Sequence, residues 1–418
     1  MKLNYKRIGD CIQLVDDRNI DGSVKKLLGL SISKEFIPSV ANTVGTNMKN
    51  YKIIRRNQFA CSTMQVRRDR KMPIALYTDT DEAIISAAYP VFEVVDTEHI
   101  LPEYLMMWFR RTEFDREACF YAIGGVRGSI EWEDFCNMEL PVPPITKQKE
   151  IVSEYNVLVD RINLNNLLIQ KLEETTYALY KQWFVDFEFP AEKDKPYKSN
   201  GGEMEFNKDL NKEIPRGWRN GTLNDIADII DGDRGPNYPS LEDMQKKGFC
   251  LFLNAGNVSK TGFNFTENNF ISKEKDEALR KGKLVRNDVV MTSRGTVGNL
   301  AYYSDAITFN DIRINSGMVI LRAKEFVEGT FFLYTMLRST DMKKEIENYL
   351  SGSAQPQLPI KDLVKIPILI PDKEVLFIFS KIGLKLQKYI DTTNTQNIKL
   401  AEFQDILLSK LVTLGDSQ

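Results

Sequence analysis

The feature that most constrains this chain is an internal repeat with an interval of 228 residues. Shifted by that interval, "YLMMWFRR" at 104–111 falls on "FLYTMLRS" at 332–339, and "KLEE" at 171–174 falls on "KLAE" at 399–402, without any gap. Solenoid repeats have much shorter periods, of about 20 to 50 residues. The repeat therefore predicts two related halves, each with an α/β region followed by a helical region, and 418 residues are enough for two or three domains.

Each half ends in a stretch that has the heptad spacing of a coiled coil, with seam positions in alternating steps of three and four residues. A helix of about 40 residues is about 60 Å long and needs a partner along its length. We predict that the two helices pair antiparallel, which would bring their polar seam positions near one another. The alternative is that each helix packs only on its own domain. The predicted seam comprises Leu158, Ile162, Asn165, Ile169, Leu172 and Leu179 in the first helix and Leu386, Ile390, Thr393, Asn397, Leu400 and Leu407 in the second.

A proline stands at the same place before each predicted helix, Pro143 in the first half and Pro371 in the second. Proline cannot continue a sheet ladder but is tolerated in the first turn of a helix, so these residues separate a globular domain from a rod. The predicted fold is α/β with pseudo-twofold duplicated halves, in which two globular domains are joined by two long antiparallel coiled-coil helices. The predicted boundaries are 1–143 for the first domain, 144–189 for the first helix, 190–217 for a charged linker, 218–371 for the second domain and 372–414 for the second helix.

Catalytic and metal-binding motifs are scarce in this sequence. The single histidine is His99, the five cysteines form no CxxC pair, and no GxxxxGK[ST] phosphate loop occurs. The segment "PVPP" at 141–144 lacks the Asn or Asp that begins the catalytic tetrapeptide of an adenine methyltransferase. We therefore predict no bound metal, no ATP or NAD, and no catalysis by this chain alone. The lack of a disulfide pattern and of an apolar run of about 20 residues favours a cytoplasmic protein.

Local charge, rather than total charge, points to a nucleic-acid partner. Lys plus Arg total 56 against 58 Asp plus Glu, but residues 49–71 hold eight basic side chains and one acid. Arginine can read guanine, glutamine can read adenine, and lysine can bind phosphates. The alternative for such a run is an ordinary solvated surface. The candidate DNA-binding residues of the first half are Arg55, Arg56, Gln65, Arg67, Arg68, Arg70 and Lys71.

Three polar loops supply the corresponding candidates in the second half. The segment "VRNDVVMTSRGTVGN" at 285–299 aligns in pattern with the basic run, and its Gly295 and Gly298 would let a loop approach a groove closely. The other loops are "GDRGPNYP" at 232–239 and "LNAGNVSKTG" at 253–262. Each loop alone is typical of a turn, whereas their occurrence in one duplicated half favours recognition. The candidates are Arg234, Asn237, Tyr238, Asn257, Lys260, Thr292, Ser293, Arg294, Thr296 and Asn299.

The two junctions between domain and helix resemble a known family. They read "GGVRGSIEWEDFCNMELPVPPITKQKEIV" from Gly124 and "SGSAQPQLPIKDLVKIPILIPDKEV" from Ser351, and they are similar to the junctions in the specificity (S) subunits of Type I restriction-modification systems. The resemblance covers nearly the whole chain. One departure is Gln355, which stands where the first copy has Arg127.

This resemblance implies a non-catalytic subunit that binds double-stranded DNA. Each of two target recognition domains would read one half of a bipartite sequence, and the coiled coil would set the spacer. The implied protein partners are two methyltransferase (M) subunits and restriction/translocase (R) subunits, which would themselves bind S-adenosylmethionine, ATP and Mg. The implied complex is an adenine DNA methyltransferase and ATP-dependent endonuclease. An alternative of another class is a protein-binding scaffold with duplicated heads, which the near-neutral charge permits.

Overall fold

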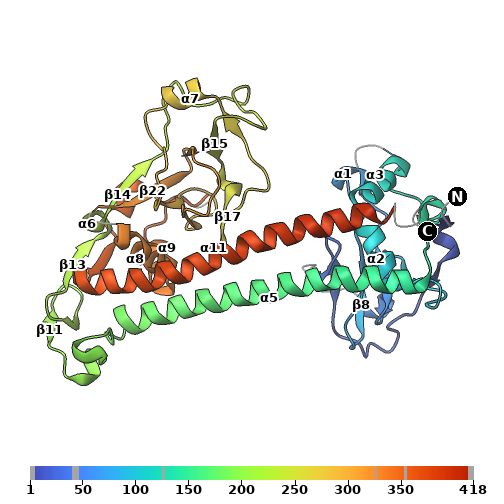
Figure 1. Ribbon diagram of the computed structural model, residues 1–418, viewed down its shortest axis with the longest axis horizontal. Helices are drawn as coiled ribbons and strands as arrows, with labels where there is room; N and C mark the ends of the chain where they lie inside the picture. The colour runs from blue at the N-terminus through green and yellow to red at the C-terminus, as the bar shows by residue number, and fades with distance from the viewer. Residues whose placement is uncertain (1–4, 40–46, 125–127, 325–326, 353–354, 413–418) are drawn as a thin grey trace. The chain divides into compact units, whose positions relative to one another are not determined.

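The computed structural model describes residues 5–39, 47–124, 128–324, 327–352 and 355–412. The chain divides into two compact units. Unit 1 comprises the described residues up to Leu164 together with those from Asn397 onward, and unit 2 comprises residues 165–396. Each unit holds one globular part, called the first head and the second head below, and one part of each of two long helices (Figure 1). In the described part of the chain, no helix is long and apolar enough to cross a membrane.

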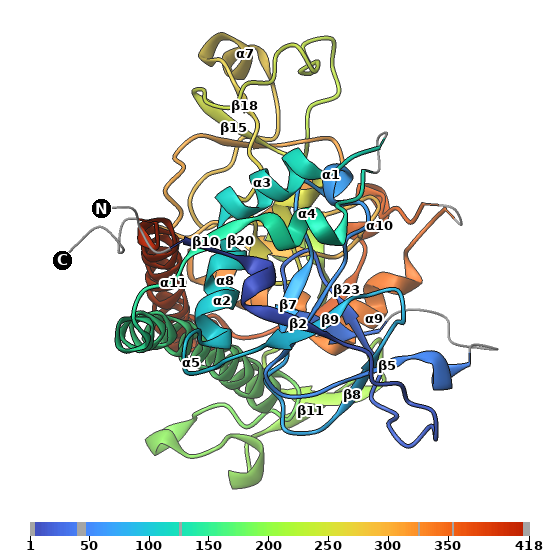
Figure 2. The same ribbon diagram turned by 90° about the vertical axis from the view of Figure 1, so that its right-hand side faces the viewer.

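The first head is built on a four-stranded antiparallel sheet with the order β2-β9-β6-β7 (Figure 2). All four residues of the inner strand β6 are buried, which explains why its sequence "QFAC" does not alternate between apolar and polar residues. The strands of this head are β1 (Tyr5–Arg7), β2 (Ile12–Val15), β3 (Leu28–Leu30), β4 (Phe36–Pro38), β5 (Lys52–Ile54), β6 (Gln58–Cys61), β7 (Ile74–Leu76), β8 (Ala83–Ile85), β9 (Val91–Val94) and β10 (Glu139–Pro141), and its helices are α1 (Val66–Asp69), α2 (Pro102–Arg110), α3 (Thr112–Tyr121) and α4 (Trp132–Asn137).

Aromatic rings fill the core of the first head. Phe59 of β6 and Phe92 of β9 stack with their centroids 5.0 Å apart, and Phe109 of α2 meets Phe59 edge-on at 5.8 Å. Helix α2 begins with Pro102, whose fixed φ suits the first turn of a helix. Every residue of α2 from Tyr104 to Phe109 is buried, so this helix is apolar nearly all round and packs as a core element.

The second head has the same kind of sheet, antiparallel with the order β14-β22-β19-β20, beside a three-stranded sheet β18-β15-β21 in which β15 and β21 are parallel. Its strands are β11 (Met204–Asn207), β12 (Lys212–Pro215), β13 (Arg219–Thr222), β14 (Ala227–Asp231), β15 (Cys250–Leu253), β16 (Val258–Ser259), β17 (Gly262–Phe263), β18 (Phe270–Ile271), β19 (Val289–Thr292), β20 (Leu300–Tyr302), β21 (Ile312–Ile314), β22 (Met318–Ala323) and β23 (Pro367–Ile370), and its helices are α6 (Leu223–Ile226), α7 (Lys273–Ala278), α8 (Val327–Arg338), α9 (Thr340–Asn348) and α10 (Ile360–Leu363).

The secondary structure recurs at the interval predicted from the sequence. Helices α3 and α9 begin at Thr112 and Thr340, and the long helices begin at Ile145 and Lys373, so that each pair is 228 residues apart. Strands β10 and β23, which pair with β1 and β13 respectively, begin at the same interval. The order of the strands in the four-stranded sheets also corresponds, because β2, β9, β6 and β7 take the places of β14, β22, β19 and β20.

The two long helices are α5 (Ile145–Phe184) and α11 (Lys373–Lys410). Helix α5 is shorter than the predicted 144–189, because Phe187 adopts a left-handed φ of 63°. The rings of Phe187 and Phe189 then pack on Trp218, with centroids 5.6 and 5.2 Å away. Burial of these rings against the second head therefore accounts for the end of the helix. The predicted end of the second helix, at 414, lies outside the described residues.

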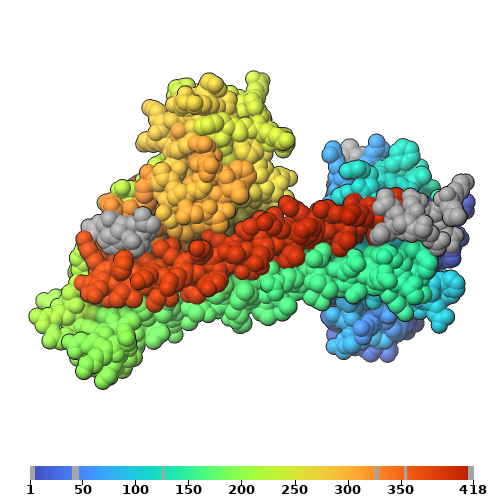
Figure 3. All heavy atoms as spheres, in the orientation of Figure 1, coloured from blue at the N-terminus to red at the C-terminus, as the bar shows by residue number. Residues whose placement is uncertain are grey.

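Inside each unit, the first part of one long helix packs near the last part of the other. In unit 1, Ile151 and Tyr155 of α5 share the core of the first head with Leu408 of α11. In unit 2, Phe379 of α11 lies 4.9 Å from Phe184 of α5, and the side chains of the two helices are in contact (Figure 3). The beginning of each helix thus packs against the end of the other.

The predicted seam coincides with the buried face of both helices. All twelve predicted seam positions are buried or half-buried, and the polar residues Asn165 and Thr393 are 3% and 6% exposed. Large apolar side chains off the seam remain exposed, among them Leu164 and Tyr389. Burial therefore follows the heptad positions rather than the apolar character of the side chain.

Candidate nucleic-acid interface

The second part of the basic run lies in a loop of the first head (residues 62–72, the basic loop) between β6 and β7. Backbone hydrogen bonds fix both ends of this loop, from Ser62 to Pro73 at 2.8 Å and from Ile130 to Thr63 at 3.0 Å. Near its end, the backbone N–H of Met72 donates to Asp115 Oδ1 of α3 at 3.1 Å. These hydrogen bonds hold the basic loop in a defined position on the first head.

The backbone of the basic loop is strained at two places. The four-residue helix α1 is flanked by Gln65 at φ 64° and Arg70 at φ 53°, both in the left-handed region. Such conformations cost about 1 to 3 kcal/mol each for residues other than glycine, and they concentrate at functional sites. They turn the chain sharply at both ends of α1, with Arg67 and Arg68 exposed between them.

The predicted candidates of the first half separate into paired and unpaired cations. Arg55 forms ion pairs with Asp17 and Glu82, each at 2.6 Å. Arg68 pairs with Asp69 at 2.6 Å, and its guanidinium holds the pKa of Asp69 below the ordinary value. Four exposed cations form no ion pair with any residue that the structure describes, and these could contact phosphates. They are Arg56, Arg67, Arg70 and Lys71.

The corresponding segment of the second head (residues 293–299, the glycine loop) connects β19 to β20. It is clamped to the segment before α10, since Leu358 donates to the carbonyl of Ser293 at 2.9 Å and Gly295 donates to that of Pro356 at 3.1 Å. Gly295 and Gly298 have φ values of 75° and 90°, which is why glycine suits both positions. The turn presents Arg294 half-buried at its edge, next to exposed Gly295 and Thr296.

Three candidates of the second half are buried, and we correct their assignment from DNA contact to support of the loops. Thr292 is fully buried, and its hydroxyl accepts from the backbone of Asn299 at 3.0 Å; Ser293 is also buried. Asn257 is buried too, and its amide donates to the carbonyls of Asn264 and Glu267 at 2.9 and 2.8 Å. The Thr292 hydroxyl and the Asn257 amide cannot hydrogen-bond a base without first leaving these partners, and burial keeps Ser293 away from the surface.

The remaining candidates of the second half have mixed surroundings. Arg234 is exposed but pairs with Asp231 at 3.1 Å, and the amide of Asn237 donates to the carbonyl of Ala278 at 3.1 Å. Tyr238 packs edge-on against Phe252 at 5.7 Å. Asn299, half-buried, donates to the carbonyl of Val258 at 3.0 Å, and Lys260 is exposed. Arg294, Thr296 and Lys260 are therefore the candidates of this head that are least engaged by the protein.

A turn that the sequence reasoning missed precedes the loop-bearing strand of each head. Asn57 and Asn287 adopt left-handed φ values of 68° and 73°, which asparagine tolerates better than most residues. Their backbone N–H groups donate to the carbonyls of Tyr77 and Tyr303 at 2.8 and 2.9 Å. The signal in the sequence is the match of "RNQ" at 56–58 with "RND" at 286–288.

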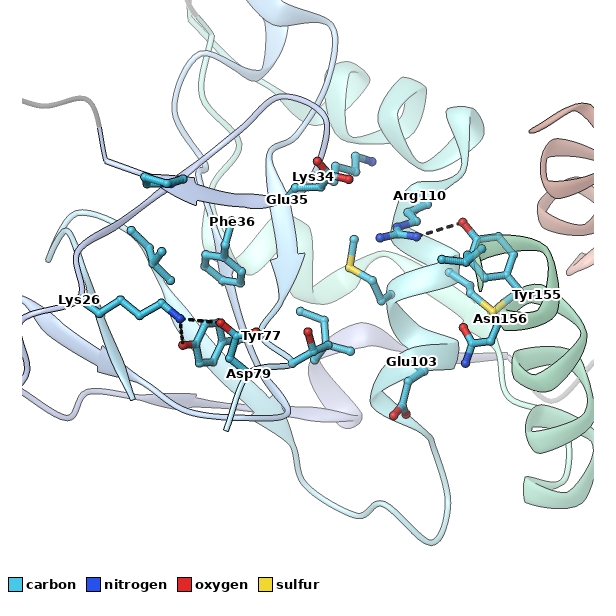
Figure 4. A pocket seen from close by; sticks show the side chains of 17 residues that line it. Lys26, Lys34, Glu35, Phe36, Tyr77, Asp79, Glu103, Arg110, Tyr155 and Asn156 are labelled. Atoms are coloured by element: carbon cyan, nitrogen blue, oxygen red, sulfur yellow. Dashed lines mark hydrogen bonds and ion pairs between the residues drawn. The ribbon is translucent and has the colours of Figure 1, made fainter. Parts of the chain in front are cut away.

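A cavity of about 520 Å³ lies in the first head, lined by residues of β3, β4, β7, α2 and α5 (Figure 4). Its cations are engaged by protein groups. Lys26 pairs with Asp79 at 2.5 Å, and Arg110 donates to the hydroxyl of Tyr155 at 3.0 Å. Lys34 pairs with buried Asp115 at 2.8 Å, and burial lowers the pKa of this lysine. The cavity therefore has little charge to offer a phosphate, and we leave it out of the candidate interface.

No cluster of three or more His, Cys, Asp or Glu side chains arranged to hold a metal ion occurs among the residues that the structure describes. His99 is exposed, and its Nδ1 lies 2.7 Å from Asp96 Oδ2. The five cysteines are free thiols, and burial raises the pKa of Cys61. The candidate surfaces of both heads are therefore described by their arginine, lysine and polar loop residues.

Comparisons with known proteins agree on one family. Residues 215–402 match the Type I restriction modification DNA specificity domain. The Type I restriction enzyme MjaIX specificity subunit of Methanocaldococcus jannaschii is 25% identical over 321 residues, which cover 76% of this chain and 70% of that relative. The HindI specificity subunit of Haemophilus influenzae is 24% identical over 394 residues, covering 80% and 81%.

A solved structure supports the fold. The crystal structure of a Type-I restriction-modification system S subunit from M. genitalium aligns with 99% of this chain and 96% of its own, with a TM-score of 0.56 and 15% sequence identity. At that identity the similarity concerns the mixed α/β fold. Together with the sequence relatives, it confirms the resemblance predicted from the two junctions.

Proposed function

We propose that this chain, which belongs to the specificity subunits of Type I restriction-modification systems, reads a bipartite DNA sequence with one half-site for each head. The observation that carries the proposal is the matched pair of loops. The basic loop and the glycine loop follow equivalent strands, β6 and β19, and each leaves arginine outside the core of its head.

The two loops have the chemistry that DNA recognition requires. Exposed arginine and lysine side chains neutralise phosphates, and an arginine fork at the edge of a groove can bond a guanine through two hydrogen bonds. In the first head the phosphate contacts come from Arg56, Arg67, Arg70 and Lys71. In the second head Arg294 is the base reader, since the rigid clamp of the glycine loop limits where its side chain can reach.

The long helices set the distance between the half-sites in this proposal. The support is the pairing of opposite helix ends inside each unit, with Phe379 against Phe184 in unit 2 and Leu408 with Ile151 in unit 1. An antiparallel coiled coil built on these contacts resists compression, because shortening it would expose the buried seam. The spacer between the half-sites is therefore expected to be constant.

The chain is a non-catalytic subunit, and Type I specificity subunits act together with methyltransferase and restriction subunits. We assign two methyltransferase subunits to it, one for each half, because the heads are duplicated. S-adenosylmethionine, ATP and Mg are assigned to those partner subunits, where methyl transfer and cleavage would take place.

Binding to a library of random duplexes tests the proposal. The chain, co-expressed with its methyltransferase subunits, is expected to enrich a defined set of sequences and to bind them more weakly as salt rises from about 50 to 200 mM. Competition by a duplex of unrelated sequence serves as the control for non-specific binding. A lack of enrichment at either salt concentration would contradict the proposal and favour a protein scaffold.

A further inference from the structure

An exposed aromatic pair stands at the end of α3 in the first head. Phe120 is 82% exposed and its ring meets that of Tyr121 edge-on, with centroids 5.4 Å apart. We call these two residues the aromatic tip. Two further large apolar side chains are exposed nearby in the chain, Ile123 at 72%, two residues after the tip, and Met64 at 46%, in the basic loop. A single exposed apolar residue is ordinary, but a group of them marks a surface that meets a partner.

The aromatic tip lies beside the basic loop. Cys119 Sγ, one residue before Phe120, is 3.8 Å from the carbonyl oxygen of Val66, and Met72 is bonded to Asp115 one turn earlier on α3. The basic loop therefore runs along α3, and both views show α1 and α3 side by side (Figures 1 and 2).

The charges around the aromatic tip select a polyanion as the partner. Two of the three acids of α3 pair with cations, Asp115 with Lys34 at 2.8 Å and Glu113 with Arg111 at 3.4 Å. The third, Glu117, is half-buried, and burial raises its pKa, which favours its neutral form. Arg116 is exposed on α3 one turn before Phe120 and forms no ion pair with any described residue. Arg116 and the exposed cations of the adjacent basic loop, Arg67, Arg70 and Lys71, supply the positive charge that binding to DNA phosphates requires.

The second head provides an internal comparison. At the interval of 228 residues, Asn348 takes the place of Phe120 and Ser351 takes that of Ile123, whereas Lys344 keeps the positive charge of Arg116. Asn348 is exposed at the end of α9 and donates to Glu345 Oε2 at 3.2 Å. The position of Tyr121 keeps an aromatic residue, Tyr349, which is half-buried against the core of the second head. The fold therefore does not need an aromatic residue at the position of Phe120, and the exposed pair of rings belongs to the first head.

We propose that Phe120, supported by Tyr121, is an apolar wedge that enters a groove of the DNA and opens a base step in the half-site of the first head. This inference rests on the proposed function. Apolar side chains inserted between base pairs partly unstack them and kink the duplex, and burial of the ring offsets the cost of unstacking. The first head then favours an easily unstacked pyrimidine–purine step at a place where no hydrogen bond reads a base. The second head leaves its half-site stacked.

The variant Phe120→Asn, which gives the first head the residue of the second, tests the wedge in the complete complex with methyltransferase subunits. The enriched duplex carries 2-aminopurine at successive positions of each half-site, and its fluorescence reports unstacking. We expect the variant to bind the recognition duplex at least about tenfold more weakly than the wild type does. We also expect the loss of one fluorescence increase, confined to one half-site. Phe120→Trp should keep both signals.

Phe206→Asn is the matched control, because Phe206 is another phenylalanine with a largely exposed ring, on β11 of unit 2. It should leave affinity and fluorescence unchanged, and the melting temperature of Phe120→Asn should equal that of the wild type since the lost ring is exposed. Unchanged affinity and fluorescence in Phe120→Asn would overturn the wedge. Loss of co-purifying methyltransferase subunits would overturn it too, by showing a protein contact. Failure of the wild-type complex to select any sequence would instead contradict the proposed function itself.

Discussion

Arg322 binds Asp288 through two parallel hydrogen bonds, Nε to Oδ1 and Nη2 to Oδ2, each 2.8 Å long. Asp288 directly precedes β19 and also accepts from the backbone of Val285 at 2.8 Å. In the first head, Gln58 stands in this position, donating to Glu93 at 3.0 Å and accepting from the backbone of Arg55 at 2.8 Å. Each pair fixes the turn from which the loop-bearing strand starts.

Asp288→Ala should destabilise the second head by about 2 to 3 kcal/mol, because it leaves the guanidinium of Arg322 without its partner and the turn without its acceptor. Gln58→Ala, the matched change in the first head, removes two hydrogen bonds of an uncharged amide and should cost about 1 kcal/mol. Urea unfolding, monitored by hydrogen exchange of the amides in each head, measures both effects. An equal loss in the two heads would contradict the importance of the ion pair.

The stability of the second head should depend on pH through Asp276. Burial opposes the charged form of this carboxyl, but Lys283 at 2.6 Å and Arg313 at 2.5 Å outweigh it and keep the pKa of Asp276 below its ordinary value of 3.8. Since the folded pKa lies below the unfolded one, the contribution is fully present above the unfolded value and is lost as pH falls through the folded one.

The melting temperature of Asp276→Asn, measured between about pH 7 and pH 2.5, checks this sign. At neutral pH the variant should melt below the wild type, and the difference should shrink as the pH falls below about 4. Asp79→Asn, which alters an exposed pair with Lys26, is the control and should show a much smaller difference at every pH. A difference between Asp276→Asn and wild type that grows in acid would have the wrong sign.

Arg294→Ala should lower the affinity of the complex for its recognition duplex by about 1 to 3 kcal/mol and relax the preference at one base position in the half-site of the second head. Arg70→Ala, which changes an exposed cation of the first head, should weaken binding to all sequences alike and reduce the salt slope by about one. Competition binding with duplexes substituted at each position separates the two outcomes. A uniform loss for Arg294→Ala would show that this residue contacts only phosphate.

Phe379→Ala should cost unit 2 about 3 to 5 kcal/mol, because this fully buried ring packs edge-on against Phe184 at 4.9 Å and its removal leaves a cavity. Phe377→Ala, two residues away on α11 and half-exposed, should cost less than about 1 kcal/mol. Thermal unfolding of the two variants provides the comparison. Equal losses would contradict the packing of α11 on α5 through Phe379 and Phe184.

The sequence predicts the repeating framework well because the signals for it are local. Heptad spacing identifies the buried face of both helices down to Asn165 and Thr393, and the interval of 228 residues reproduces the starts of α3, α9, α5 and α11. The end of α5 was placed too late, because the aromatic contacts of Phe187 and Phe189 with Trp218 join residues about 30 positions apart.

The binding surface is harder to predict, because the state of a charged side chain depends on partners distant in the chain. Arg55 looks like the other basic residues of its run, yet its ion pairs are with Asp17 and Glu82. Thr292 resembles an exposed loop residue, yet its buried hydroxyl accepts a hydrogen bond from the backbone of Asn299 at the other end of the glycine loop. Phe120 was missed because an aromatic residue at the end of an amphipathic helix is normally read as core.

Mapping methylated adenines at base resolution, after expression of this chain with its methyltransferase subunits in a host without other adenine methylation, tests the central claim most directly. The proposed function, with one half-site for each head and the long helices as the spacer, predicts a motif of two specific blocks separated by a gap of constant length and free sequence. A single continuous motif, or two blocks at variable separation, would contradict it.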